Sequence, residues 1–415
     1  MSADPGALEV WLDGQVVVDL TMNRRRVPQL RYRGRYVAEQ GIGALGLSVP
    51  LPVASRPFRG DIVDYWIENL LPEGETRTVL ERYFGVRRGD GFALLAAIGR
   101  DCAGAVAVMP PGQSLDQLSG ALLPLTPAEV NEAIASLRQH PLGVDDDVRV
   151  SLGGLQSKLL LVQVDGGWAR PVGGLPSTHI LKPDPPEFPG LAASEAFAQK
   201  AAELAGLSAA EARLDVCGGR TVLVVTRFDR GVTSGKLTRR HQEDGCQALG
   251  IDPSGAGKYQ APGNGASYRR LAGVLTAHAS DQAGELRRLG SMLAFTVAIG
   301  NTDAHLRNHA FLHLAGKLAL APIYDAAPTV AFASTRQLAL WVDEQPLLAA
   351  VTRSHMIREM VSWGLDRDEA ALVVSGTLAR LAHAYDEAAQ AVPEAATSVI
   401  DHCKRRTETF LQQQS

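Results

Sequence analysis

Three side chains in the C-terminal half of the chain have the types and the spacing needed to transfer a phosphoryl group. Asp303 and Asn308 lie five residues apart within Gly300-Asn-Thr-Asp-Ala-His-Leu-Arg-Asn308, and Asp325 comes later, after Tyr324. This Asp-to-Asn interval is that of a protein-kinase catalytic loop. In such a site one carboxylate orients the attacking hydroxyl and accepts its proton, while the amide and a second carboxylate hold Mg²⁺. The segment therefore indicates chemistry at the γ-phosphate of ATP.

The chain between Asn308 and Asp325 is predicted to form a short hairpin. His309 to Leu314 alternate in polarity, Ala315-Gly316 supply a turn, and Lys317 to Ala321 run back. A loop with Asp and Asn, a hairpin and then a second Asp is the order by which kinase folds bring three groups to one phosphate.

A glycine-rich segment, Ser151-Leu-Gly-Gly-Leu-Gln-Ser-Lys158, lies between two strand-like runs at 148–150 and 159–164. Gly153 and Gly154 would let backbone N–H groups approach an anion closely and cradle phosphate oxygens. The spacing matches neither GxGxxG nor a Walker A loop. From this segment alone, a Gly-Gly β-turn within a hairpin is the favoured interpretation.

A lysine closes the next apolar strand. Lys182 ends Thr178-His-Ile-Leu-Lys182, just before Pro183, and a predicted helix containing Glu195 follows. In kinases such a lysine pairs with nucleotide phosphates and with a helix carboxylate. A lysine snorkelling at a strand end explains the pattern equally well. Glu195 alone is better explained as a carboxylate favoured near a helix N-terminus.

Two further segments leave alternatives open. Val224-Val-Thr-Arg-Phe-Asp-Arg230 is typical of a strand leaving a sheet, followed by a charged turn. Kinase backbone groups at such a place bind the adenine edge, but a structural Arg–Asp pair fits the same residues. The acidic pair Glu243-Asp244 most simply serves the N-terminus of a helix.

The composition is that of a globular protein with a large core. Of 415 residues, 46% are hydrophobic and 21% are charged, and the formal net charge is -4. Strong non-specific binding to nucleic acid is therefore not expected. A basic stretch, Arg24-Arg25-Arg26 with Arg31, Arg33 and Arg35, could contact phosphate backbones. The alternation over 31–35 better fits the solvated face of a strand.

Nothing in the sequence indicates export or membrane insertion. The four cysteines are far apart and form no CxxC pair, and the N-terminus lacks the pattern of a signal peptide. No apolar run is long enough to span a bilayer. We expect a cytoplasmic protein with no membrane contact, no zinc cluster and no disulfide framework.

The periodicity predicts mixed α/β structure first and mostly helices afterwards. Strands are expected at 8–12, 15–20, 30–37, 48–52, 148–164, 178–181 and 221–227. Helices are expected at 61–69, 73–84, 91–98, 127–137, 192–205, 268–279, 282–299, 352–363 and 366–389. A loop is expected at 252–266, and the order as a whole favours a bilobal kinase-like fold.

Together these segments resemble the HipA family, the serine/threonine kinase toxins of bacterial toxin–antitoxin pairs. The N-terminal part carries Asp64-Tyr-Trp-Ile-Glu-Asn-Leu-Leu-Pro-Glu-Gly74 and Leu94-Leu-Ala-Ala-Ile-Gly-Arg-Asp-Cys-Ala-Gly-Ala105. The C-terminal part carries the Ser151 segment, Ile180-Leu-Lys-Pro183, Arg227-Phe-Asp-Arg230, Gln242-Glu-Asp244, Gly300-Asn-Thr-Asp-Ala-His305 and Pro322-Ile-Tyr-Asp325. The resemblance covers nearly the whole chain.

The resemblance implies an α+β, bilobal protein-kinase-like fold. Its N-terminal lobe is mixed α/β with an extra N-terminal β-rich subdomain, and its C-terminal lobe is all-α. The implied division is an N-terminal subdomain at 1–110, a linker and helix at 111–147, the ATP-binding part of the N-terminal lobe at 148–240 and the helical lobe at 241–415.

The resemblance also implies the roles of the site residues. Asp303 is implied to be the catalytic carboxylate, with Asn308 and Asp325 as Mg²⁺ ligands. The implied ATP-binding residues are Gly153, Gly154, Leu155, Gln156, Ser157, Lys158, Lys182, Thr226, Arg227, Phe228, His305, Asn308, Tyr324 and Asp325. Thr226 stands where the family usually has Glu, which puts in question only a side-chain contact at the adenine.

Regulation and partners follow from the same resemblance. Ser151 matches a serine that family members autophosphorylate, which ejects the loop and switches the kinase off. The expected partners are a protein substrate with an acceptor Ser or Thr, a small HipB-like helix-turn-helix antitoxin and, mainly through that antitoxin, DNA. Family targets include a tRNA synthetase, but the sequence gives no grounds for choosing that or any other translation factor.

Two other functions compete with an ATP- and Mg²⁺-dependent protein kinase toxin. Phosphoinositide-kinase-like catalytic loops also have the pattern Asp-x-His-x-x-Asn, so a small-molecule or lipid kinase is the alternative enzyme. A non-catalytic corepressor acting with a DNA-binding antitoxin is the alternative from another class. The presence of Asp303, Asn308, Asp325 and Lys182 argues against it, since a degenerate kinase usually loses at least one.

Overall fold

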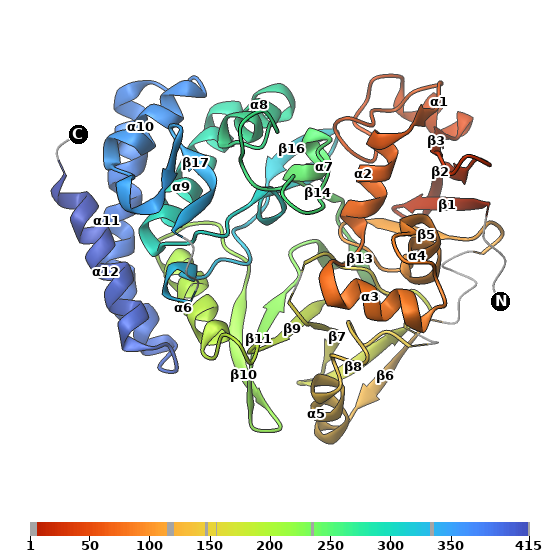
Figure 1. The fold of residues 1–415 in the computed structure, drawn as a ribbon, viewed down its shortest axis with the longest axis horizontal. Coiled ribbons are helices and arrows are strands. Elements are labelled where there is room, and N and C mark those ends of the chain that lie inside the picture. Colours follow the sequence, from red (N-terminus) through yellow and green to blue (C-terminus); the bar gives the residue numbers. More distant parts are fainter. Residues whose placement is uncertain are drawn as a thin grey trace.

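The computed structural model describes residues 6–113, 120–145, 148–154, 156–233, 236–332 and 336–413. The described chain is arranged in three parts (Figure 1). An N-terminal subdomain, red to orange, lies at one side, and a mostly helical half, green-blue to blue, lies at the other. A sheet built from the middle of the chain, in yellow and light green, lies between and below them.

The N-terminal subdomain is a five-stranded antiparallel sheet in the order β4-β3-β2-β1-β5, with helices packed on it. Every second residue of β1 is buried, as an amphipathic strand requires. The strands are β1 (Ala7–Leu12), β2 (Gln15–Met22), β3 (Pro28–Tyr32), β4 (Phe58–Arg59) and β5 (Val106–Met109). The helices are α1 (Gly34–Gln40), α2 (Asp61–Leu70), α3 (Gly74–Tyr83) and α4 (Gly91–Ile98).

The expected strand at 30–37 is wrong in its second half. β3 ends at Tyr32, and Arg33 stands at the N-cap of α1, where its guanidinium pairs with Glu9 and Asp19. Arg35 pairs with Glu39 one helical turn later. The alternating arginines therefore do not form the face of a strand, because two of them belong to the start of a helix. The expected strand at 48–52 is reduced to a single bridge between Ser48 and Leu51.

The central sheet has six strands in the order β10-β11-β9-β7-β8-β6. Its helix α5 (Pro127–Ala135) begins with a capping box, since Thr126 and Glu129 each bind the other's backbone N–H. The strands are β6 (Ala121–Leu125), β7 (Leu159–Val164), β8 (Gly167–Val172), β9 (His179–Pro183), β10 (Ala212–Cys217) and β11 (Arg220–Thr226). The hairpin of β12 (Arg230–Thr233) and β13 (Lys236–Arg239) follows, and α6 (Leu191–Leu204) packs against β10 and β11.

The glycine-rich segment is not the turn of a hairpin. Val150 forms a parallel bridge with Asp101 of the N-terminal subdomain, whereas β7 pairs with β8 and β9. The expected strand over 148–164 therefore exists only from Leu159 onward. Residues 148–158 run as an irregular connection along one wall of the molecule's cleft, so far as they are described.

The C-terminal half is mostly helical, but the expectation of an all-α lobe is wrong. It contains a three-stranded sheet of β14 (Gln242–Asp244), β15 (Ala310–Leu314) and β16 (Lys317–Leu320), and a hairpin of β17 (Gln337–Val342) and β18 (Gln345–Leu347). The predicted hairpin after Asn308 is one arm of the first sheet. The helices are α7 (Gly245–Leu249), α8 (Tyr268–His278), α9 (Gln282–Ile299), α10 (Arg353–Ser362), α11 (Arg367–Ala391) and α12 (Thr397–Gln412).

Two large apolar cores stabilise the two ends of the molecule. One joins α6 to α8–α12 and includes the fully buried rings of Phe197 and Tyr385, which stack at 5.9 Å between centroids. The other fills the N-terminal subdomain and extends to Val148 and Val150. None of the helices in the described residues is both long and apolar enough to cross a membrane.

Candidate active site

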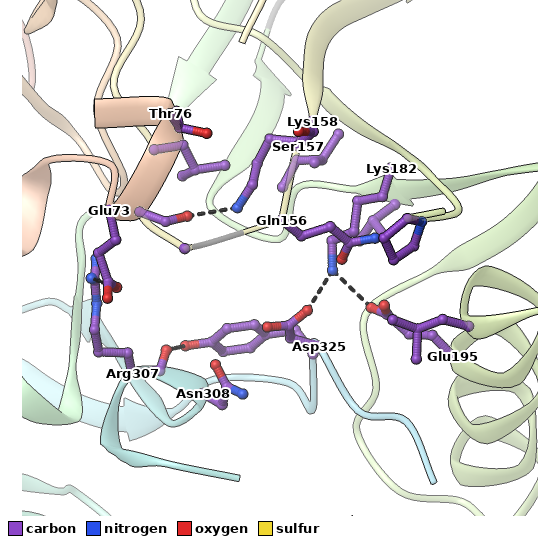
Figure 2. A pocket seen from close by; sticks show the side chains of 18 of the residues that line it. Glu73, Thr76, Gln156, Ser157, Lys158, Lys182, Glu195, Arg307, Asn308 and Asp325 are labelled. Atoms are coloured by element: carbon purple, nitrogen blue, oxygen red, sulfur yellow. Dashed lines mark hydrogen bonds and ion pairs between the residues drawn. The ribbon is translucent and has the colours of Figure 1, made fainter. Parts of the chain in front are cut away.

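A cleft of about 1020 Å³ opens where the three parts of the molecule meet. Its walls come from the start of α3, the glycine-rich segment, the ends of β9 and β11 and the loops before and after the β15–β16 hairpin. Figure 2 shows labelled side chains from α3, the glycine-rich segment, β9 and the loops around the hairpin facing this space. The predicted site residues that line it are Gly153, Gly154, Gln156, Ser157, Lys158, Lys182, Thr226, Arg227, Phe228, Asp303, His305, Asn308, Tyr324 and Asp325. Leu155 lies outside the described residues.

Lys182 is the buried centre of an ion-pair network with Glu195, which is also buried, and Asp325, which is partly exposed. Its Nζ lies 2.9 Å from Oε1 of Glu195 on α6 and 2.5 Å from Oδ1 of Asp325 (Figure 2). Burial alone would lower the pKa of Lys182, but the two carboxylates outweigh that effect and raise this pKa, so the ammonium stays protonated. The snorkelling interpretation is wrong, because the lysine side chain is 8% exposed and points into the protein.

Glu195 is a site residue that the sequence suggested only weakly. Its side chain is 4% exposed and faces Lys182 rather than the N-terminus of its own helix. The interpretation as a carboxylate favoured by the helix dipole is therefore wrong. A charged residue that continues the buried face of an alanine-rich helix was the available signal.

Asp325 is held in a left-handed backbone conformation, with φ of 54°. For a residue with a Cβ this costs about 1 kcal/mol or more, so neighbouring contacts must fix it. Tyr324 supplies one, since its hydroxyl donates to the carbonyl of Arg307 over 2.6 Å while its ring lies 5.4 Å from that of Phe228. Burial would raise the pKa of Asp325, but Lys182 lowers it to about 2. The carboxylate is therefore an anion ready to bind a cation.

The predicted catalytic loop, residues 300–308, presents Asp303 to the open cleft. The backbone N–H of Asp303 donates to Oδ1 of Asn301 over 2.9 Å, and the side-chain amide of Asn308 donates to the Asp303 carbonyl over 3.0 Å. The protein around the Asp303 carboxylate removes part of its hydration, and together with the charge of Asp325 this raises its pKa to about 6. An acid with such a pKa is ionised at neutral pH and is a better proton acceptor than an ordinary carboxylate.

The glycines of the phosphate segment are required by close approach. A Cβ on Gly153 would lie 1.9 Å from Nη2 of Arg307, and Gly154 has a φ of +108°. The Nζ of Lys158 donates to the Gly153 carbonyl over 2.6 Å. Burial lowers the pKa of Lys158 to about 8, with the nearby charge of Lys182 adding to the effect. The cations of Arg307 and Lys158 thus both lie against the backbone of Gly153 and Gly154, which carry no side chains.

Ser151 lies at the root of this segment and does not line the cleft. It is fully buried, its Oγ donates to the Leu70 carbonyl over 2.5 Å, and its N–H donates to the Asp101 carbonyl over 2.9 Å. Both partners belong to the N-terminal subdomain. In this conformation the hydroxyl is shielded from any phosphate donor.

The strand end at 226–228 presents backbone, and not the Arg227 side chain, to the cleft. The Arg227 guanidinium is buried and binds Asp229 at 2.9 Å, Ser177 and the Cys102 carbonyl. The Arg–Asp pair that the sequence left open is therefore present. It anchors the strand end to the N-terminal subdomain, while residues 226–228 still line the cleft.

Two residues of the loop 252–266 reach the site, although no sequence pattern singled them out. Lys258 is almost fully buried and binds Oε2 of Glu73 at 2.8 Å, and the hydroxyl of Tyr259 lies 3.3 Å from Oδ1 of Asp303. Glu73 also pairs with Arg307 of the catalytic loop. Of the acidic pair before α7, Asp244 caps the helix as expected, whereas Glu243 is buried and binds His313 and Ser48.

The residues present fit a nucleotide with Mg²⁺. The amide nitrogen of Asn308 is already bound to the Asp303 carbonyl, which leaves its oxygen available in the cleft that the anionic Asp325 also lines. The Nδ1 atom of His305 is buried at the cleft with no hydrogen-bond partner among the described residues. The described residues contain no cluster of three or more acidic, His or Cys side chains that could hold a metal alone.

The fold and the cleft are those of a bilobal kinase, in which a lysine–glutamate pair, a glycine-rich segment and the loop that carries Asp303 and Asn308 face one space. Family models match both parts of the chain: a HipA N-terminal domain over residues 8–109 and a HipA-like C-terminal domain over residues 150–385. The chain belongs to the HipA family of kinases.

Individual relatives agree with this assignment. Y4mE of Sinorhizobium fredii, which is described as a kinase, is 32% identical over 93% of this chain and 90% of its own. The serine/threonine-protein kinase toxin HipA of Shewanella oneidensis is 31% identical over 68% of this chain and 67% of its own. The solved complex of the Shewanella oneidensis toxin–antitoxin proteins HipA and HipB with operator DNA contains a chain that matches with a TM-score of 0.81. That match has 25% identity and covers 98% of this chain and 100% of the other.

Proposed function

We propose that this protein is an ATP- and Mg²⁺-dependent protein serine/threonine kinase and the toxin of a HipA/HipB-type module in the cytoplasm. The observation that carries the proposal is the convergence of Lys182, Asp325 and Asp303 on one cleft beside a glycine-rich segment. Each of these charges has a task in phosphoryl transfer, and they come from segments far apart in the sequence. A binding module would need none of them in this arrangement.

The chain's own residues account for the main steps. Lys182 and Lys158 would neutralise phosphate oxygens, and the backbone N–H groups of Gly153 and Gly154 would cradle them. Asn308 and Asp325 would hold Mg²⁺, which supplies charge compensation across the phosphates. Asp303 would orient the acceptor hydroxyl and take its proton as the oxygen attacks the γ-phosphorus. The bond to the bridging oxygen then breaks and ADP leaves.

The adenine end is supported by the backbone of residues 226–228. The Thr226 side chain takes no part in the Arg227 ion pair, and the strand's main chain is fixed by the hydrogen bonds from Thr226 to Glu211 and from Arg227 to Thr178. A backbone contact to the adenine edge does not depend on the residue type at 226. We therefore expect ATP to bind despite the replacement of the usual Glu.

The toxin role and the partners rest on likeness. The relative from Shewanella oneidensis is named as a kinase toxin, and the matching structure holds HipB and operator DNA. By analogy, this chain would bind a small helix-turn-helix antitoxin and reach DNA mainly through it. Its substrate would be a cellular protein with an acceptor Ser or Thr, and growth would stop when that protein is phosphorylated.

Phosphotransfer with two kinds of acceptor tests the enzyme class. Purified protein with labelled ATP and Mg²⁺ is expected to label itself or a protein in a cell extract, and to leave lipids and small metabolites unlabelled. Expression without an antitoxin should arrest growth, and Asp303→Ala should abolish the arrest. Labelling confined to a lipid or metabolite would favour the small-molecule kinase instead. Absence of any labelling by protein that binds ATP would favour the corepressor.

A further inference from the structure

Lys258 is a buried cation between the phosphate segment and the catalytic carboxylate, and it has no assigned task. Its side chain is 4% exposed, and the one ion pair it forms within the described residues is with Glu73 at 2.8 Å. Glu73 also accepts from Arg307, whose Nη2 lies against Gly153. On the other side, the neighbouring Tyr259 hydroxyl reaches Asp303. Lys258 thus lies along a chain of contacts that runs from the phosphate segment to Asp303.

The loop that carries Lys258 is joined to the catalytic loop and is braced by hydrogen bonds of its own. The Leu306 N–H donates to the Lys258 carbonyl over 3.1 Å, and the Tyr259 ring packs edge-on to His305 at 5.3 Å. The side chain of Asn264 binds the Tyr259 carbonyl and the N–H groups of Ala261 and Ala266. A glycine-rich loop that only connected two elements would not need these braces.

The charges in the cleft explain why another cation is useful. Lys182 is matched by Glu195 and Asp325, and Arg307 is matched by Glu73 and Asp244. The γ-phosphoryl group spreads negative charge over three oxygens during transfer, so donors aimed at it accelerate the reaction. If Lys258 leaves Glu73, that carboxylate still has Arg307 as a partner. The ion pair can therefore be exchanged without leaving a buried charge alone.

We propose that Lys258 is a γ-phosphate-binding residue that exchanges Glu73 for a phosphoryl oxygen when ATP enters. This rests on the proposed function, because it takes Asp303 as the group that accepts the proton during phosphoryl transfer. Lys258 makes no bond and breaks none in the reaction. The acceptor oxygen bonds to the γ-phosphorus, its proton goes to Asp303, and the bridging oxygen leaves with ADP while Lys258 holds an equatorial oxygen.

Comparison of two nucleotides tests the proposal independently of activity. Calorimetry with Mg²⁺ would measure the Kd of ADP and of the non-hydrolysable analogue with a β,γ-imido bridge. For Lys258→Met we expect the Kd of the analogue to rise about tenfold, as loss of one charge-assisted hydrogen bond predicts, with the Kd of ADP unchanged. Lys258→Arg should recover most of the difference. Lys200→Met, on the surface of α6, is the matched control and should change neither constant.

Equal weakening of both nucleotides by Lys258→Met, or of neither, would overturn the proposal. If Lys258→Met fails to fold, Glu73→Gln decides the question. Removing the competing carboxylate should tighten the analogue at least about threefold and leave ADP unchanged, and a looser or unaltered analogue would contradict the exchange. Failure of the proposed function would give a different result, since in that case Asp303→Ala would keep full phosphotransfer. Wild-type phosphotransfer with unaltered analogue binding in Lys258→Met would overturn the role of Lys258 alone.

Discussion

Nζ of Lys182 on β9 donates to Oε1 of Glu195 on α6 over 2.9 Å, with both side chains almost fully buried. The pair links the sheet that would hold ATP to the helix that forms one edge of the helical core. Because Lys182 also binds Asp325, the position of α6 affects the residue that would hold Mg²⁺.

Removal of the Glu195 charge should affect both stability and nucleotide binding. We expect Glu195→Gln to lower the free energy of unfolding by about 3 kcal/mol, since it takes one partner from a buried lysine, and to weaken ATP about tenfold. Glu203→Gln is the matched control on the same helix, because its side chain is 62% exposed. Chemical denaturation and calorimetry measure the two effects. A variant that binds ATP as tightly as wild type would show that the pair is only structural.

The two acidic residues of the cleft should separate binding from chemistry. Asp303→Ala is expected to leave nucleotide affinity within about threefold of wild type but to slow phosphotransfer by about a thousandfold or more, because the proton acceptor is lost while the phosphate contacts remain. Autophosphorylation and nucleotide affinity are the measurements. Full activity in Asp303→Ala would sink the assignment of this residue.

Asp325→Ala is expected to act on binding itself. It removes a carboxylate that would hold Mg²⁺ and leaves Lys182 with Glu195 alone, so the affinity for ATP in the presence of Mg²⁺ should fall about tenfold or more. Chelation of Mg²⁺ with EDTA should reproduce most of the loss in wild type and add little in the variant. If EDTA weakened the variant as strongly as wild type, the metal would be held elsewhere.

Asp101 joins the N-terminal subdomain to the start of β12 through a buried ion pair. Its Oδ1 lies 2.8 Å from Nη2 of Arg230, and its side chain is fully buried. Asp101→Asn should lower the free energy of unfolding by about 3 kcal/mol. Asp386→Asn should cost less than about 0.5 kcal/mol, since the pair of Asp386 with Lys404 is exposed. Equal effects of the two variants on thermal unfolding would show that the buried pair contributes nothing special.

The same ion pairs predict how stability depends on pH. Burial would raise the pKa of Asp101 and of Asp229, but Arg227 and Arg230 outweigh it and lower both values. Because the folded-state pKa lies below the unfolded value of about 3.9, the stabilisation is complete above about pH 4 and is lost as pH falls further. The free energy of unfolding of wild type should therefore drop below pH 4. In Asp101→Asn that drop should be smaller.

The sequence predicted those parts of the site whose residues are close together in the chain. The loop from Asp303 to Asn308 and the turn at Ala315-Gly316 depend on local geometry, and the structure contains both. Ala315 and Gly316 each have a positive φ. The roles assigned to these residues remain predictions. Lys258 was not predicted as a site residue because its partner Glu73 is 185 residues away in the chain. No local sequence pattern indicates such a contact.

Errors in the fold have a similar cause. The arginines at 31, 33 and 35 show a period of two. Arg33, however, forms ion pairs with Asp19 and Glu9, and the helix α1 begins after it. The helix α12 was not expected, although its buried residues Val399, Cys403, Thr407 and Phe410 recur at helical spacing. For the arginines a tertiary contact, and not the local pattern, decided the structure.

Ser151 is the residue whose modification should switch the kinase off. Its hydroxyl is buried against the Leu70 carbonyl, so phosphorylation requires residues 150–154 to leave this position first. A phosphate there adds about two negative charges, and the fully buried Ser151 hydroxyl, bound to the Leu70 carbonyl, leaves no space for that group in the present conformation. The modified segment should therefore stay out and fail to cradle ATP.

We predict that incubation with ATP and Mg²⁺ gives one dominant phosphosite at Ser151, with ATP affinity falling as it accumulates. Mass spectrometry and calorimetry follow the two quantities, and Ser151→Ala, which keeps the segment in place, should retain its ATP affinity throughout. Protein phosphorylated at Ser151 that binds ATP as tightly as the unmodified form would rule the switch out.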